Sequence, residues 1–160
     1  MNAFERAWSL LKAPIRQGSV RRDYDADKYR NAREYAAIFD DPVSGEELPM
    51  TATMFDDNES DDVSAAIGQD DEIYNLPPRA RAEGGKRDHI GNEVLMQGVN
   101  TDEEFQRRGY ATALYDFIAY LLSHRNQKLA PHWDQSPDGK ALWASRELDE
   151  EGHWPVRGDL

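Results

Sequence analysis

The spacing of apolar residues along this 160-residue chain changes from helix-like to strand-like and back again. The first segment has four apolar residues separated by four, three and four positions: Phe4, Trp8, Leu11 and Ile15. This spacing places them on one face of a helix. Because proline disrupts a helix, Pro14 predicts that this helix ends or kinks near residues 12–13. The apolar face would pack either on the core of this chain or on a partner chain, including a second copy in a dimer.

The middle of the chain reads mainly as strands. Asp25 is expected to cap a short helix that carries Tyr29, Ala32 and Ala36. Apolar segments near residues 34–40 and 48–56 then flank the turn sequence PVSGEE, so they predict a β-hairpin. The segment VSAAIGQ at 63–69 predicts a third strand.

Residues 76–92, LPPRARAEGGKRDHIGN, contain two prolines and three glycines and predict a long basic loop. A loop of this length inside a domain is usually either functional or disordered, and the sequence leaves both readings open.

The second half of the chain carries the strongest pattern. The apolar run EVLMQGV at 93–99 predicts a central strand, and Gly98 inside it indicates a bulge or a close approach of another backbone or ligand. An amphipathic helix is expected from about Arg108 to His124, and a strand at 128–134. Ser136 is a suitable N-cap and Pro137 a suitable first residue for a last helix. These elements predict a mixed α/β fold.

The composition narrows the function classes. A formal net charge of −12 argues against general binding to nucleic acid or to anionic membranes. The absence of cysteine excludes disulfides, thiolate nucleophiles and cysteine-based zinc sites. No apolar run approaches the ~20 residues of a membrane span, and the N-terminus lacks the apolar region of a signal peptide. We therefore expect a cytoplasmic protein. The four histidines are scattered, so no metal site is expected.

The hexapeptide QRRGYA, Gln106–Ala111, opens the strongest predicted helix. Two arginines add positive charge where the helix dipole is already positive, which disfavours an isolated helix start. A bound phosphate would neutralise this positive charge. It could reach the helix start because the first N–H groups of a helix are unpaired and Gly109 lets a ligand approach the backbone. The alternative is an ordinary helix start with solvated arginines.

QRRGYA fits the signature Gln/Arg-x-x-Gly-x-Gly/Ala of the GCN5-related N-acetyltransferase (GNAT) superfamily, and it lies in the same context, between a strong strand and a helix. The chain resembles this superfamily over residues 34–147, most specifically over 93–146. The resemblance implies a central mixed, mostly antiparallel sheet flanked by helices, here with an extra N-terminal helix. It divides the chain into an N-terminal extension (1–33), an acetyltransferase-like core (34–148) and a C-terminal tail (149–160).

The resemblance implies that acetyl-CoA is a co-substrate. The residues that would hold its pyrophosphate are Gln106, Arg107, Arg108, Gly109, Tyr110 and Ala111, with the Thr112 hydroxyl as a further contact. The strand end at Gln97, Gly98 and Val99 would bind the pantetheine arm as an added strand does, and an amide at the bulge would polarise the thioester carbonyl.

The same resemblance implies transfer of the acetyl group to an amine of unidentified type. Glu93 occupies the position of a general base, although a solvated glutamate at a strand start is the plainer interpretation. Trp143 stands where the superfamily places a tyrosine acid, and indole cannot supply that proton. Either Tyr110, Tyr115 or His132 replaces it, or no acid is used, or the protein is a weak or inactive module that binds CoA or a protein partner through its N-terminal helix and acidic surface.

Overall fold

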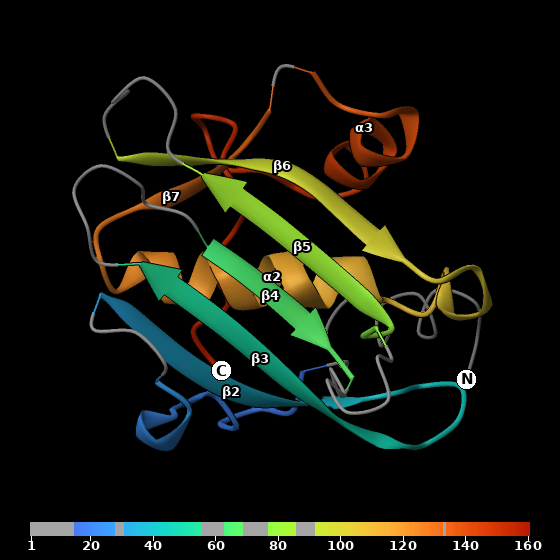
Figure 1. Cartoon of the computed structure of the whole chain (residues 1–160). Helices are drawn as coiled ribbons and strands as arrows, with labels where there is room; N and C mark the ends of the chain where they lie inside the picture. The colour runs from blue at the N-terminus through green and yellow to red at the C-terminus, as the bar shows by residue number, and fades with distance from the viewer. Residues whose placement is uncertain (1–14, 28–30, 56–62, 69–76, 86–91, 133) are drawn as a thin grey trace.

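The computed structural model describes residues 15–27, 31–55, 63–68, 77–85, 92–132 and 134–160 (Figure 1). The described residues form one sheet of seven strands, which lie side by side in chain order. The strands are β1 (Arg21–Arg22), β2 (Ala32–Asp40), β3 (Glu47–Phe55), β4 (Val63–Ile67), β5 (Ala80–Gly85), β6 (Glu93–Thr101) and β7 (Lys128–Pro131). All neighbours pair antiparallel except β6 and β7, which are parallel.

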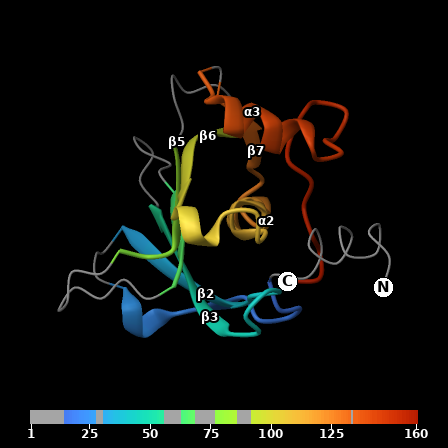
Figure 2. The same ribbon diagram turned by 90° about the vertical axis from the view of Figure 1, so that its right-hand side faces the viewer.

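Two α-helices are present among the described residues, and both lie on the same side of the sheet (Figure 2). Helix α2 (Tyr110–Ser123) connects β6 to β7, and α3 (Pro137–Ala144) follows β7. Two short 3-10 turns, η1 (Tyr24–Ala26) and η2 (Glu103–Phe105), complete the described elements. The chain is therefore an α+β protein with a mixed, mostly antiparallel sheet, which confirms the predicted sheet type.

The core lies between the sheet and α2. Along β3, buried and more exposed residues alternate, as in a strand with one face against the core. Every residue of α2 except Ala111, Tyr120 and Ser123 is buried. The reason is that the sheet covers one side of α2 while the C-terminal segment crosses another. There the indole Nε1 of Trp154 donates to Asp116 Oδ1 at 2.8 Å.

Several local predictions are confirmed. The turn PVSGEE joins β2 to β3, and the predicted third strand, central strand and long helix are β4, β6 and α2. The Ser136 hydroxyl accepts a hydrogen bond from the Gly139 amide at 3.1 Å, and Pro137 begins α3. Each of these features depends on neighbouring residues, so a local sequence pattern is enough to predict it.

The predicted loop at 76–92 is wrong over its middle part, since residues 80–85 form β5. Its core-facing positions are Ala80, Ala82 and Gly84, which are poor strand formers and so conceal the strand from a propensity argument. Small residues are needed there because a Cβ on Gly84 would lie 2.9 Å from Met96 Sδ and 3.1 Å from the Leu95 carbonyl oxygen.

The helix predicted around Ala32 and Ala36 is also wrong, because both residues belong to β2. Their backbone groups pair with Phe55 and Thr51 of β3, so long-range pairing overrides the local helical spacing. The predicted N-terminal helix lies in residues 1–14, outside the described residues. Ile15, the last residue of its apolar stripe, instead forms an isolated antiparallel bridge with Phe39 and is buried.

None of the described helices is both long and apolar enough to cross a membrane.

Candidate functional site

Strand β6 extends beyond its neighbour β7. The two strands pair from Glu93 opposite Lys128 to Met96 opposite Pro131, where β7 ends. Residues 98–101 of β6 stay paired with β5 on one side, but residues 97–101 have no strand partner among the described residues on the other. This leaves N–H and C=O groups of β6 at an open edge that an extended polar ligand can pair with.

A bulge lies where the open edge begins. Gly84 of β5 pairs with Met96, whereas the preceding Glu83 pairs with Gly98, so Gln97 is an extra residue in β6. Because of this extra residue, every later position of β6 lies on the opposite face of the sheet from the one that regular alternation would give. Val99 therefore lies on the α2 side of the sheet with its partner Ala82. This confirms the bulge that Gly98 indicated.

The turn into α2 has an unusual backbone. Arg107 has a φ of 64° and Gly109, the N-cap, has a φ of 83°, so both are left-handed. A left-handed arginine costs about 1–2 kcal/mol, which indicates that the surrounding structure imposes the turn. Gly109 offers no side-chain oxygen to the helix. The first-turn N–H groups of Tyr110, Ala111 and Thr112 are thus left for an external acceptor.

A cavity of about 650 Å³ lies between the end of β6, the start of α2 and one face of α3. Of the predicted cofactor residues, those that line it are Val99, Gln106, Arg107, Gly109, Tyr110, Ala111 and Thr112. The other side of the cleft is lined by Ser136, the N-cap of α3, and by Gly139, Ala141 and Leu142 of α3. The open strand edge and the unpaired helix start therefore border one cleft, although they are separated by the connection through η2.

Gln106 and Arg108 have structural partners. The Gln106 side-chain amide donates to the Thr101 carbonyl at 3.2 Å and so ties the turn to the strand end. The Arg108 guanidinium lies 3.5 Å from the buried Asp41 carboxylate, and Arg108 is not among the residues that line the cleft. Of the two arginines in QRRGYA, only Arg107 faces the cleft.

Asp41, which the sequence analysis did not single out, contacts this turn from the first position after β2. Its carboxylate accepts hydrogen bonds from the Tyr110 hydroxyl and from the amides of Val43 and Ser44. Burial alone would raise the pKa of Asp41, but these hydrogen bonds and Arg108 hold it below its usual value. Burial, followed by the bond to Asp41, raises the pKa of Tyr110 to about 12. An aspartate directly before a Pro-x-x-Gly turn is the available sequence signal.

The residues considered as replacements for the tyrosine acid are not all in the cleft. Trp143 is buried, with its ring 5.8 Å from Tyr115 and 5.1 Å from Trp154. Tyr115 is buried in the same cluster, and burial raises its pKa to about 12. The Tyr110 hydroxyl is bonded to Asp41, and His132 Nδ1 accepts from the Asp134 amide at 3.0 Å.

Glu93, the predicted general base, lies at the start of β6. Its carboxylate is 3.1 Å from Nε2 of His153 in the C-terminal segment. Gln97 lies four positions after Glu93, which is about 13 Å of strand. The structure therefore does not bring Glu93 to the cleft, because Glu93 begins β6 whereas the cleft lies at the other end of the strand.

The geometry suits an elongated ligand with an anionic group, because a strand edge offers hydrogen bonds along a chain while a helix start offers them to one anion. Comparison of the chain with protein-family models, with curated proteins and with solved structures gives no match.

Proposed function

We propose that this protein binds acetyl-CoA in the cleft between β6, α2 and α3 and transfers the acetyl group to an amine. The observation that carries the proposal is the shared border of the cleft: an unpaired strand edge at 99–101 and an unpaired helix start at 109–112. The QRRGYA motif, on which the resemblance to the GNAT superfamily rests, forms this helix start.

In this proposal, the pyrophosphate lies against the amides of Gly109–Thr112 with Arg107 beside it. The pantetheine arm runs along the open edge of β6 toward the bulge at Gln97. Acetyl-CoA supplies the activated acyl group. The amine nitrogen forms a bond to the thioester carbonyl carbon, the C–S bond breaks, and the amine loses a proton to a base.

A second candidate is a CoA-binding module without efficient catalysis. It is favoured by the surroundings of the predicted acid and base. Glu93 is bonded to His153, and Trp143 packs in the core beside Tyr115. Neither residue lines the cleft.

Titration with acetyl-CoA by isothermal calorimetry tests the cleft. Arg107→Glu should weaken binding about ten- to a hundredfold, because a charge-assisted hydrogen bond contributes about 1.5–3 kcal/mol. The control is Arg21→Glu, which makes the same charge change on an exposed residue of β1. If wild-type protein does not bind at millimolar acetyl-CoA, or if both variants bind equally, the assignment of the cleft is wrong.

Turnover separates the two candidates. With acetyl-CoA bound and a panel of amines added, release of free thiol above the rate of thioester hydrolysis supports the transferase. Saturable acetyl-CoA binding with no amine-dependent release supports the binding module.

A further inference from the structure

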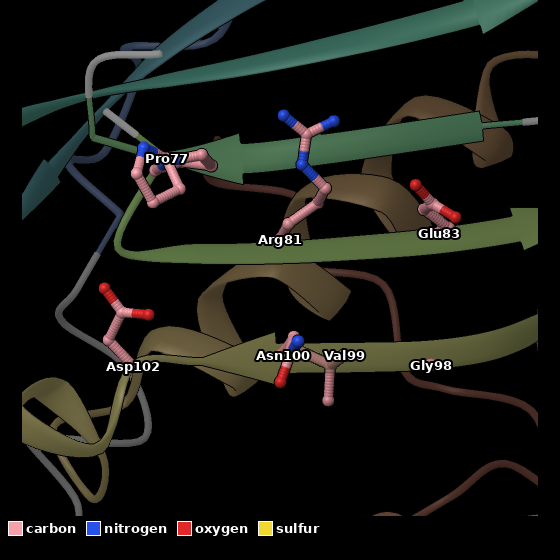
Figure 3. Close-up of a pocket in the computed structure, with 8 residues that line it drawn as sticks. Pro77, Arg81, Glu83, Gly98, Val99, Asn100 and Asp102 are labelled. Atoms are coloured by element: carbon pink, nitrogen blue, oxygen red, sulfur yellow. The ribbon is translucent and has the colours of Figure 1, made fainter. Parts of the chain in front are cut away.

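A second cavity, of about 500 Å³, lies over β5 and β6 (Figure 3). Arg81 and Glu83 of β5 line it, and their partners in the register of β6 are Asn100 and Gly98. These residues alternate with the core-facing Ala80 and Ala82, so the cavity is on the face of the sheet away from α2. The acetyl-CoA cleft is on the α2 face.

The two cavities share part of their lining. Val99 and Asn100 border both, so one strand separates them. On its β7 side that strand has no partner after Met96 among the described residues. A group in the cleft and a group in the second cavity can therefore meet around the open edge of β6.

The second cavity carries unpaired negative charge. Glu83 and Asp102 lie toward its opposite ends (Figure 3), and neither carboxylate has an ion-pair or hydrogen-bond partner among the described residues. Arg81 lies between them, but it already has an interaction partner. Its guanidinium projects toward β4 in Figure 3. Both carboxylates belong to exposed residues, so a cationic ligand can reach them.

Gly98 opens the cavity at the bulge. A Cβ built on Gly98 would meet no atom within 4 Å, so the fold does not require glycine there. Gly98 pairs with Glu83, and paired residues of neighbouring strands lie only about 4.5–5.5 Å apart. A small cationic group beside Glu83 is therefore next to the strand position toward which the acyl end of the cofactor would point.

We propose that the second cavity binds the acceptor, and that this acceptor is a primary amine with a second cationic group, of the polyamine class. Glu83 holds the amino group nearest the bulge, and Asp102, about 13 Å further along the strand, holds the distal one. As an acceptor assignment this rests on the proposed transferase function, whereas amine binding does not require acetyl-CoA. In the transfer, the ammonium group first gives a proton to solvent. Its nitrogen then bonds to the acetyl carbon, the C–S bond breaks, the nitrogen gives a second proton to solvent, and the departing thiolate takes one proton from solvent.

The probe is spermidine, titrated at physiological salt in the absence of acetyl-CoA. Glu83→Gln and Asp102→Asn should each weaken binding about tenfold, since each removes one charge-assisted hydrogen bond. The control Glu104→Gln removes the same charge from an exposed residue two positions from Asp102 that does not line the cavity, and it should bind like wild type. Gly98→Val should also weaken binding, by filling the cavity.

Three results would overturn the inference: no saturable binding of spermidine to wild type, equal effects of Glu83→Gln and Glu104→Gln, or binding of L-glutamate as tight as that of spermidine. The last result would identify Arg81 as a carboxylate site and the ligand as a zwitterion. Since this titration contains no acetyl-CoA, its outcome is independent of the acetyl-CoA titration. Loss of acetyl-CoA binding alone refutes the transferase, and loss of spermidine binding alone refutes the acceptor assignment.

Discussion

At the scale of single residues, adjacent side chains of like charge have different roles. Arg107 lines the cleft, whereas Arg108 pairs with Asp41. Asp40 forms a partly exposed ion pair with Arg16, whereas Asp41 is 2% exposed and bonded to Tyr110. Burial makes the difference. A solvent-exposed ion pair contributes little to the stability of the fold, whereas removal of a buried carboxylate leaves its hydrogen-bond donors without an acceptor.

Asp41→Asn should lower the free energy of unfolding by about 1–3 kcal/mol, because the charged acceptor of the Tyr110 hydroxyl and of Arg108 is lost. The neighbouring Asp40→Asn should cost about 0–1 kcal/mol. Urea denaturation of the two variants checks this prediction, and equal losses would contradict it.

The pKa of Asp41 adds a dependence on pH. Because it is lowered in the folded state, the unfolded state binds the proton more readily. The stabilisation by Asp41 is thus fully present above its unfolded pKa of about 3.9 and is lost as the pH falls through the folded pKa. Asp41→Asn should show a shallower fall in unfolding free energy than wild type below about pH 4. Parallel curves in that range would refute the role of the charge.

At the scale of elements, the β5–β6 pair determines the geometry of the cleft. The extra residue Gln97 turns Val99 toward α2 and Asn100 toward the opposite face, so one strand lines two cavities. Gly84, opposite the start of the bulge, lies too close to Met96 and Leu95 to carry a side chain without a shift of its neighbours.

Gly84→Ala and Gly98→Ala form a matched pair across this bulge. Gly84→Ala should lower the free energy of unfolding by about 1–3 kcal/mol, because its Cβ would crowd the Leu95 carbonyl. Gly98→Ala adds a methyl group in open space and should change stability by less than about 0.5 kcal/mol. Thermal unfolding of both variants measures the difference, and the reverse order would rule out the described packing at the bulge.

At the scale of the whole molecule, the C-terminal segment joins the sheet and α2 into one core. The Trp154 amide donates to the Leu129 carbonyl of β7 at 2.9 Å, and its indole donates to Asp116 of α2. Asp116 is 1% exposed and also accepts from Arg146 at 2.8 Å, with Arg157 at 3.7 Å. The C-terminal segment is thus anchored to the core through its buried residues His153, Trp154 and Leu160.

Asp116→Asn should lower the free energy of unfolding by about 3–5 kcal/mol, because it leaves two poorly exposed arginines without their carboxylate. Asp134→Asn, on an exposed residue before α3, makes the same substitution and should be nearly neutral. Chemical denaturation followed by tryptophan fluorescence reports on this region directly, since Trp143 and Trp154 are in contact there. Similar losses in the two variants would show that the buried cluster does not stabilise the fold.

Much of the candidate cleft could be predicted from sequence because its parts are local. The helix predicted from about Arg108 to His124, the Ser136 cap and the bulge near Gly98 all follow from residues within a few positions of one another. The motif QRRGYA identifies the helix start for the same reason. Periodicity and capping act within one segment, so one segment is sufficient to reveal them.

The tertiary structure alone decided which of these residues face the cleft. Strand β5 was concealed because alanine and glycine fit its close contact with β6 but are poor strand formers. The Arg108 side chain contacts Asp41, 67 positions away, and the Glu93 side chain contacts His153, 60 positions away. No local pattern specifies such partners, since they depend on which buried charges the completed fold brings together. By itself, the sequence determined the motif and those elements whose pattern is local, such as β6 and α2. The packing of distant segments decided strand β5, the open edge of β6, the two cavities and the partners of Arg108 and Glu93.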